Sequence, residues 1–294
     1  SIPADDEIKT KECEAIGPAI KNLLEKNIRP RDILTKTSFQ NAATVMAAMG
    51  GSTNGVIHLL ALAQEAKVDF TLKHIQQIFR NTPVICNFAP RGQKTMWDLH
   101  QLGGTPLILK ILLEEGYIQG DVMTVTGNTL TDNLKNISPQ LPNRDLITTA
   151  KQAFKPFADM QICFGNLAPE GIVFKVSDPK CSVFEGKSLC FNSATAVAKA
   201  ASEGLIQPGH VIILRYLGPV ASGMPEVLIA SSALAVKHLK GKVALISDTR
   251  VSGVSHGLIG VHCSPEAIVG GPIACIQDDD IISFDLKDPV TFPK

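Results

Sequence analysis

The chain has 294 residues with 28 basic and 28 acidic side chains, so its formal net charge is zero. This balance provides no basic surface of the kind that binds nucleic acid. Hydrophobic residues make up 45% of the chain and charged residues 19%, which is typical of a soluble globular protein of one large or two ordinary domains. The apolar runs are too short and too interrupted to span a membrane.

The cysteines are scattered and form no CxxC pair: Cys13, Cys86, Cys163, Cys181, Cys190, Cys263 and Cys275. Their odd number and irregular spacing argue against a disulfide framework and indicate a reducing compartment. They also give no local pattern for zinc or iron–sulfur ligands. Because the chain starts without Met and ends at DPVTFPK without an evident closing element, we expect it to be part of a longer protein.

The first 80 residues are predicted to be almost entirely helical. Residues 8–27 place apolar side chains at helical spacing, and a further helix is expected to begin near Thr37 and Ser38 and to end at Gly50. Residues 52–54 (STN) then begin another helix. Its N-terminus could bind an anion, but plain helix capping explains the same residue types.

The stretch from residue 71 to the expected domain boundary alternates short elements. A short helix over 71–80 precedes the strand-like PVICNFAPRGQ, and Pro106 is expected in the first turn of a later helix. GDVMTVTGNTL predicts a short strand, a turn at Gly127 and a helix start. Residues 134–160 are polar and contain prolines, so we place a linker there, with a boundary near 155.

Beyond residue 155 the sequence becomes rich in short strands. The strand-like segments are ICFGN, GIVFKV, HVIILRYL, KVALIS, ACIQ and DIISFDL. Helical stretches over 193–205 and 225–239 interrupt them. We therefore predict an α/β protein: residues 1–155 form the helix-rich tail of an α/β/α domain, and residues 156–294 form a β-barrel-like domain with flanking helices.

The segment SDTRVSGVSHG, residues 247–257, follows the apolar run KVALI. A strand that opens into a loop with glycines is a common position for chemistry, because the scaffold holds the loop while its amides and hydroxyls stay free. The segment offers two hydroxyls, Ser252 and Ser255, together with Asp248, Arg250 and His256. An ordinary polar turn would have the same composition.

Four separated blocks resemble the dihydroxy-acid and 6-phosphogluconate dehydratase family. They are PRDILTKTSFQNA through GGSTNGVIHLLALA, GDVMTVTGNTL, GNLAPEG, and RYLGPVASGMPEV through SDTRVSGVSHG to SPEAIVGGPIA. Their order and spacing cover nearly the whole chain, which makes the resemblance far more specific than any single motif.

The resemblance implies a dehydration. A 2,3-dihydroxy acid loses its C3 hydroxyl as water and its C2 proton, and the resulting enol tautomerises to a 2-oxo acid. The expected reaction converts 2,3-dihydroxy-3-methylbutanoate to 3-methyl-2-oxobutanoate in isoleucine and valine biosynthesis, with a sugar acid or 6-phosphogluconate as the alternative substrate. The family implies an iron–sulfur cluster (2Fe–2S or 4Fe–4S) as Lewis acid, a Mg²⁺ ion that holds the substrate, a serine base and a homodimer.

Matched position by position, Ser252 corresponds to the serine base and Glu226 to a magnesium-binding carboxylate. Magnesium prefers hard oxygen ligands. A serine acts as a base only when its alkoxide is stabilised, so the amides of Gly253, Val254 and Ser255 are expected to contact the alkoxide or the substrate.

The chain departs from the family at two places near this site. The family usually has DGR followed by an aromatic or bulky apolar residue before SG, where this chain has Thr249 and Val251. Residues 220–222 are VAS in place of a Gly-rich segment. These changes are expected to reshape the loops, with consequences for substrate access and inhibitor sensitivity.

The family's cluster cysteines, its other magnesium carboxylates and its carbamylated lysine belong to segments upstream of the matched blocks. We therefore expect no cluster ligand in this chain, and Cys163, Cys263 and Cys275 are interpreted as small buried residues. Residues 1–294 alone are expected to be inactive, and a non-catalytic homologue or dimerisation module is the alternative. The resemblance places the enzyme in mitochondria or plastids of a eukaryote, or in the cytoplasm of a bacterium.

Overall fold

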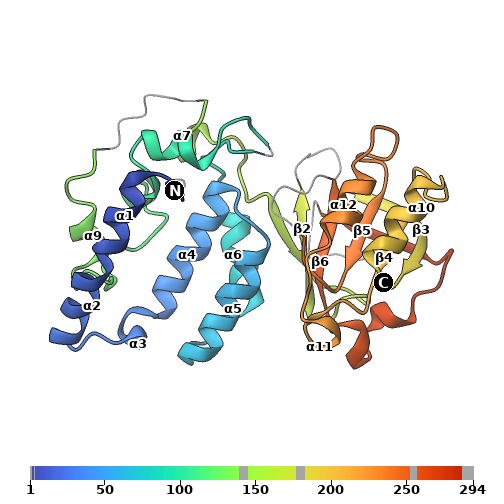
Figure 1. The fold of residues 1–294 in the computed structure, drawn as a ribbon, viewed down its shortest axis with the longest axis horizontal. Helices are drawn as coiled ribbons and strands as arrows, with labels where there is room; N and C mark the ends of the chain where they lie inside the picture. The colour runs from blue at the N-terminus through green and yellow to red at the C-terminus, as the bar shows by residue number, and fades with distance from the viewer. Residues whose placement is uncertain are drawn as a thin grey trace. The chain divides into compact units, whose positions relative to one another are not determined.

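The computed structural model describes residues 2 and 4–286, apart from 90, 139–144, 177–182 and 252–256. The chain divides into two compact units (Figure 1). Unit 1 comprises residues 1–51 and 56–158, and unit 2 comprises residues 52–55 and 159–294. The predicted identity of residues 1–155 and 156–294 as parts of two family domains stays a prediction.

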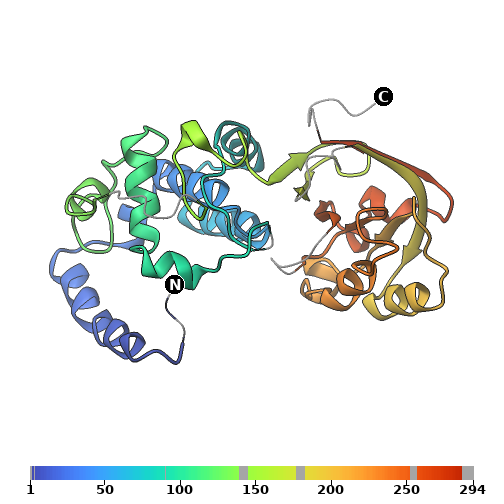
Figure 2. The ribbon, with the colours of Figure 1, turned by 90° about the horizontal axis from the view of Figure 1, so that it is seen from above.

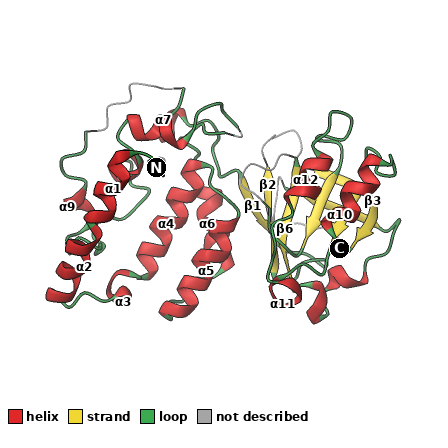
Figure 3. Ribbon diagram, in the orientation of Figure 1, coloured by secondary structure: helices red, strands yellow, loops and turns green. Residues whose placement is uncertain are grey.

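The regular structure described in unit 1 is helical (Figure 3). Its elements are α1 (Glu7–Glu14), α2 (Ile16–Glu25), α3 (Pro30–Ile33), α4 (Lys36–Met49), α5 (Asn54–Ala66), α6 (Leu72–Asn81), α7 (Met96–Gln101), α8 (Thr105–Glu114), α9 (Leu130–Asn133) and the 3₁₀ helix η1 (Ala150–Gln152). The prediction of an almost entirely helical first 80 residues is confirmed over the described part of that range. In the described segments, no helix combines the length and apolarity needed to cross a membrane.

Local hydrogen bonds explain where the helices of unit 1 begin and end. The Thr35 hydroxyl accepts the amide hydrogen of Ser38 at 3.2 Å, which makes Thr35 the N-cap of α4. The predicted cap at Thr37 or Ser38 is therefore wrong by two to three residues, because Thr35 and Ser38 form a reciprocal capping box. Gly50 ends α4 with φ of 66°, a conformation that glycine adopts without penalty.

The core of unit 1 lies around α8, whose first turn contains Pro106 as predicted. Apolar side chains of α8 pack with residues 85–86 and 146–147. The strand predicted for PVICNFAPRGQ is wrong: residues 84, 86 and 88 make isolated bridges instead of a continuous ladder. GDVMTVTGNTL likewise forms one bridge, Met123 to Thr129, followed by the expected start of α9.

Unit 2 combines a sheet with helices on its flanks. Its elements are β1 (Met160–Cys163), β2 (Gly171–Val176), β3 (Val183–Phe191), α10 (Ala194–Ser202), β4 (Val211–Leu214), α11 (Pro219–Ser222), α12 (Leu228–Leu234), β5 (Ala244–Ser247), β6 (Leu258–Ser264), the 3₁₀ helices η3 (Ala267–Val269) and η4 (Pro272–Cys275), and β7 (Ile281–Asp285).

The strands form one seven-stranded sheet in the order β1-β2-β6-β5-β4-β3-β7. Neighbours among β3, β4, β5 and β6 run parallel, while β1, β2 and β7 are added antiparallel to their neighbours. The sheet curls into a half-barrel (Figure 2), so the predicted α/β class with a barrel-like part and flanking helices is confirmed.

Five of the six predicted strand segments contain strands, and ACIQ is the exception. Pro272 occupies the first turn of η4, which supplies a helical φ and no amide donor, so this segment turns instead of extending. Two strands were not predicted, β3 and β6. β3 alternates exposed and half-buried residues over most of its length, and β6 gains its burial from β2 and β5 on either side.

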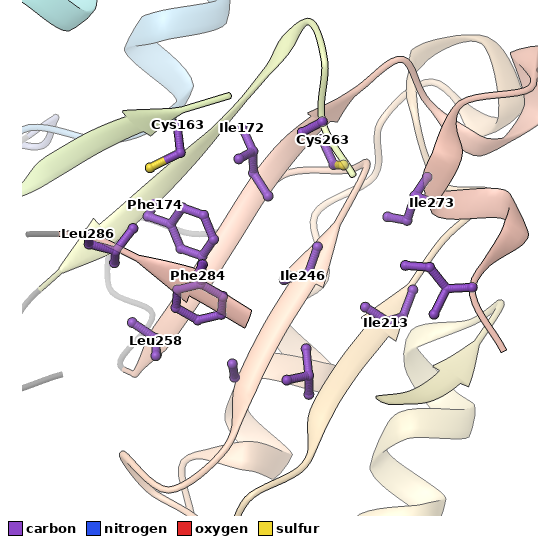
Figure 4. Packing of buried hydrophobic residues seen from close by; sticks show 14 of the residues in the cluster. Cys163, Ile172, Phe174, Ile213, Ile246, Leu258, Cys263, Ile273, Phe284 and Leu286 are labelled. Carbon is purple, nitrogen blue, oxygen red and sulfur yellow. The ribbon is translucent and has the colours of Figure 1, made fainter. Parts of the chain in front are cut away.

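The core of unit 2 fills the concave side of the curled sheet (Figure 4). Alternate residues of neighbouring strands point into it, including Phe174 of β2, Ile213 of β4 and Ile246 of β5. The rings of Phe174 and Phe284 lie 4.6 Å apart between centroids. Residues at intervening positions, such as Ile212, are also buried, because α10 and α12 cover the other face of the parallel strands. Burial on both faces explains the continuous apolar runs of β4 and β5.

Candidate functional site at the carboxyl edge of the parallel strands

Parallel strands end at the same edge of a sheet, here called the carboxyl edge, where β3, β4, β5 and β6 all finish. Loops that leave this edge in α/β proteins commonly carry binding and catalytic residues. The loop after β4, residues 215–227, contains Glu226, and the segment after β5 contains Arg250 and leads toward Ser252. The curled sheet therefore brings two predicted site segments to one edge.

The backbone of Glu226 pairs with that of Arg250 in an isolated parallel bridge. The Val227 amide donates to the Arg250 carbonyl at a long 3.4 Å. The Arg250 Nε in turn donates to the Met224 carbonyl at 2.9 Å, so the same arginine contacts both sides of the glutamate. The Glu226 side chain is exposed and remains accessible to a ligand.

Thr249 adds a side-chain bond to the same loop. Its Oγ1 donates to the carbonyl of Pro225 at 2.6 Å, and Thr249 is fully buried. Pro225 immediately precedes Glu226, so this departure from the family pattern acts on the loop that carries the predicted magnesium ligand. Val251, the other departure in this motif, is buried as an apolar side chain.

Asp248 connects three loops of the carboxyl edge. Its Oδ2 accepts the amide hydrogens of Tyr216 at 3.0 Å and Ala267 at 3.1 Å, and its Oδ1 accepts that of Leu217 at 3.2 Å. The residue is only 1% exposed. Backbone donors stabilise a buried carboxylate by replacing its hydration, so Asp248 holds the loop after β4 and the start of η3 against the end of β5.

Glu266 likewise holds α11 in place through hydrogen bonds to backbone amides. Its two carboxylate oxygens accept the amide hydrogens of Val220 at 2.7 Å and Ala221 at 3.1 Å. Gly218 is required here, because a β-carbon at that position would overlap the Glu266 carboxylate. Sequence reasoning missed Glu266, although it lies in SPEAIVGGPIA, one of the blocks that carry the family resemblance.

The structure describes only some of the predicted site residues. Glu226 lies at the carboxyl edge beside Arg250. Ser252, Gly253, Val254 and Ser255, as well as His256, lie outside the described residues. The assignment of Ser252 as base and of its neighbours as alkoxide or substrate contacts therefore stays a prediction, as does the magnesium role of Glu226.

The donor set around Glu226 can be compared with what each expected cofactor needs. An exposed carboxylate is a suitable oxygen ligand for Mg²⁺, which requires several such ligands. Over the described ranges, however, no three His, Cys, Asp or Glu side chains come together in a group that could hold a metal ion. Among the described residues, Glu226 is thus suited to contribute one oxygen to a magnesium site, and no group of side chains fits an iron–sulfur cluster.

Burial also affects two of the described cysteine thiols. Burial raises the pKa of the Cys86 thiol to about 12, and it does the same for Cys263, where the Asp248 carboxylate adds to the effect. A thiol with such a pKa is a poor metal ligand, because the thiolate is the coordinating form. Cys163 and Cys263 are buried as predicted, whereas the prediction for Cys275 is wrong, since it lies exposed at the end of η4.

Unit 2 also contains a cavity of about 330 Å³. Apolar side chains of the concave core line much of it, including Phe174, Ile246, Ile276 and Phe284. Neither Glu226 nor Arg250 is among its lining residues. Because the titratable groups lie on the loops, we assign the candidate site to the carboxyl edge and not to this cavity.

Comparison with known proteins gives the same family for both parts of the chain. Residues 1–133 match the model of the dihydroxy-acid/6-phosphogluconate dehydratase N-terminal region, and residues 145–290 match that of the C-terminal region.

Among the relatives, the dihydroxy-acid dehydratase of Francisella tularensis subsp. novicida (strain U112) is 44% identical over 286 residues, which cover 97% of this chain and 51% of that protein. The dihydroxy-acid dehydratase of Sulfurisphaera tokodaii is 45% identical over 287 residues, with the same coverage of 97% and 51%. That of Lactococcus lactis subsp. lactis is 42% identical and covers 97% of this chain and 50% of the relative. The chain spans about half the length of the curated relatives that it matches. Two adjoining family models and these relatives agree along almost the whole chain, which therefore belongs to the dihydroxy-acid/6-phosphogluconate dehydratase family.

Proposed function

We propose that the protein containing this chain dehydrates a 2,3-dihydroxy carboxylic acid to a 2-oxo acid. The substrate is 2,3-dihydroxy-3-methylbutanoate and the product is 3-methyl-2-oxobutanoate, in branched-chain amino-acid biosynthesis. The names of the relatives, dihydroxy-acid dehydratases, support this choice. The family model also covers 6-phosphogluconate dehydratases, so a phosphorylated sugar acid is the second candidate substrate.

In the proposed reaction, Ser252 accepts the proton from C2 of the substrate. The electron pair of the broken C–H bond forms the C2–C3 double bond, and the C3–O bond breaks as the hydroxyl leaves and is protonated to water. The enol then loses the proton of its C2 hydroxyl and gains a proton at C3, which gives the 2-oxo acid. A serine is far too weakly basic to do this unaided, so its alkoxide must be stabilised by nearby donors and positive charge. Arg250, two residues before Ser252, is the cation that the sequence places beside it.

In this proposal Glu226 contributes one oxygen ligand to Mg²⁺, which when bound supplies positive charge to orient the substrate carboxylate and C2 oxygen. The iron–sulfur cluster of the proposal has no fitting ligand set among the described residues. The remaining ligands of both cofactors are proposed to come from elsewhere in the whole protein. A homodimer is proposed on the family resemblance alone.

The observation that carries the proposal is the pairing of Glu226 with Arg250. It brings the predicted metal ligand next to the segment that leads to the predicted base. Ser252 follows Arg250 by two residues in the sequence, which supports the proposal that the two assignments belong to one site. An acid on the far side of unit 2 would have had no such relation to the serine motif.

The test uses the full-length protein, prepared without oxygen, and measures release of 2-oxo acid from 2,3-dihydroxy-3-methylbutanoate beside 6-phosphogluconate. Turnover of the first and not the second is expected. Glu226→Gln should raise the Mg²⁺ concentration needed for half-maximal activity, because it keeps the shape of the side chain and removes its charge. Glu203→Gln is the matched control, since Glu203 is an exposed residue at the C-terminal end of α10. Turnover of neither substrate, or an unchanged Mg²⁺ requirement in Glu226→Gln, would refute the corresponding part of the proposal.

A further inference from the structure

The loop that carries Glu226 contains two strained residues. Tyr216 and Met224 have φ of 63° and 60°, in the left-handed region that residues with a β-carbon seldom occupy. Such conformations persist when surrounding contacts hold them in place. The loop after β4 is therefore expected to depend on hydrogen bonds from neighbouring segments. Such bonds are found at both Tyr216 and Met224.

These hydrogen bonds come from three consecutive residues after β5. Asp248 accepts the amide hydrogens of Tyr216 and Leu217 at the start of the loop. At its end, the Arg250 Nε donates to the carbonyl of Met224. Between these contacts, Thr249 Oγ1 donates to the carbonyl of Pro225 at 2.6 Å. Among these side-chain bonds, the one made by Thr249 is nearest to Glu226 in the chain.

This bond acts on the peptide group that immediately precedes the Glu226 α-carbon. The carbonyl of Pro225 belongs to the peptide group that joins Pro225 to Glu226, and that group is planar. Fixing its oxygen therefore fixes the plane from which the Glu226 backbone continues. A carbonyl is also the sole main-chain hydrogen-bonding group that a proline offers, because it has no amide hydrogen.

Thr249 is itself rigidly held. Its amide donates to the Ser247 hydroxyl at 3.2 Å, and its carbonyl accepts the amide hydrogen of His262 at 2.9 Å. The residue is fully buried, so its side chain has no water to exchange with the Pro225 carbonyl. A fixed backbone and a buried hydroxyl make Thr249 a suitable anchor for the loop.

We propose that Thr249 is a positioning residue for Glu226, and that its hydroxyl sets the direction in which this carboxylate meets a divalent cation. This inference rests on the proposed function, in which Glu226 is a Mg²⁺ ligand. It assigns to this chain a contact that a glycine at position 249 could not make.

The test measures Mg²⁺ binding directly, by calorimetry on the metal-depleted full-length protein. Thr249→Val keeps the shape of the side chain and removes the donor. We expect the dissociation constant for Mg²⁺ to rise about three- to tenfold, the range that corresponds to loss of one hydrogen bond between neutral groups. Thr249→Ser restores the hydroxyl and should bind within about twofold of the parent, by the same reasoning.

A matched control separates a loss of stability from a loss of Mg²⁺ affinity. Thr148→Val removes another buried hydroxyl that donates to a backbone carbonyl, that of Gln152, in unit 1. It should lower the melting temperature without changing Mg²⁺ affinity. Hydrogen exchange gives a second readout: in Thr249→Val the Val227 amide, which donates to Arg250, should exchange faster than in Thr249→Ser.

Each outcome identifies what has failed. If Thr249→Val and Thr249→Ser bind Mg²⁺ as tightly as the parent while Glu226→Gln binds it weakly, the positioning role of Thr249 is wrong and the proposed function stands. If Glu226→Gln also binds Mg²⁺ like the parent, the metal assignment itself is wrong. Should Thr249→Val not fold, Thr249→Ala is compared with Thr249→Ser, and equal affinity in these two variants overturns the inference.

Discussion

Replacing Asp248 by Asn tests whether the carboxyl edge is held together by a buried charge. The wild-type carboxylate accepts three backbone amide hydrogens, and its residue is 1% exposed. An Asn side chain has the same shape but one acceptor oxygen and one amide donor. The orientation of the new Asn side chain that keeps more hydrogen bonds directs its oxygen at the amides of Tyr216 and Ala267. The side-chain NH₂ group then faces the backbone N–H of Leu217, which loses its acceptor.

The expected loss follows from that count. One buried amide hydrogen loses its acceptor, which costs about 1–3 kcal/mol, and the two retained bonds lose their charge assistance. We therefore expect the free energy of unfolding to fall by about 2–4 kcal/mol, since contributions of this kind are not fully additive. For a chain of this size, about 1 kcal/mol shifts the melting temperature by roughly 2–4 °C. The expected decrease is thus roughly 4–16 °C, taking both ranges together.

Thermal unfolding followed by circular dichroism measures this directly, with urea denaturation as a second probe. Asp278→Asn is the matched control, because Asp278 is exposed and accepts one amide hydrogen, that of Cys190, at 2.7 Å. It should change the free energy of unfolding by no more than about 1 kcal/mol. If Asp248→Asn melted within about 1 °C of the parent, a difference far below that expected from the three bonds, the role of Asp248 in holding the loops would be wrong.

Two further predictions concern the cores and the thiols. Phe174→Ala removes a ring that is 1% exposed and 4.6 Å from that of Phe284, and should cost about 3–5 kcal/mol in urea denaturation; a loss below about 1 kcal/mol would mean that the concave core does not depend on this pair. At pH 8, alkylation of the native protein should modify Cys13 and Cys275, which are exposed, and spare Cys86 and Cys263, whose pKa values are raised to about 12 by burial. Mass spectrometry before and after unfolding checks this, and rapid native labelling of Cys86 or Cys263 would contradict it.

The strands that are easiest to predict from the sequence are those that consist of an uninterrupted run of apolar residues. β4 and β5 are buried on both faces, and VIIL and ALIS show this without ambiguity. β6 is just as central, but a glycine and His262 interrupt its apolar pattern, and part of its burial comes from β2, which is far away in the sequence. β3 pairs with the edge strand β7, and its residues are mostly exposed or half-buried. Its sequence therefore resembles that of a polar loop.

The candidate site shows the same division between local and non-local information. Glu226 could be selected from its own motif, through the family resemblance, and the structure then adds its pairing with Arg250. The supporting role of Glu266 could not be read from its motif, because it depends on a contact with amides 45 and 46 residues away in the chain. Asp248 was noted as a charge in the motif, but its three donors come from two other loops. Side chains that hold loops together become visible only once the fold has brought the loops to one edge.

The most direct measurement of the central claim is the turnover of Ser252→Ala in the full-length protein with 2,3-dihydroxy-3-methylbutanoate as substrate. Loss of a positioned base should lower turnover by about a hundredfold to ten-thousandfold. The melting temperature and the absorbance of the proposed iron–sulfur cluster should remain those of the parent. Ser202→Ala, at an exposed serine on α10, should retain full turnover. Turnover of Ser252→Ala within a few-fold of the parent would contradict the assignment of the base to this segment and with it the proposed mechanism.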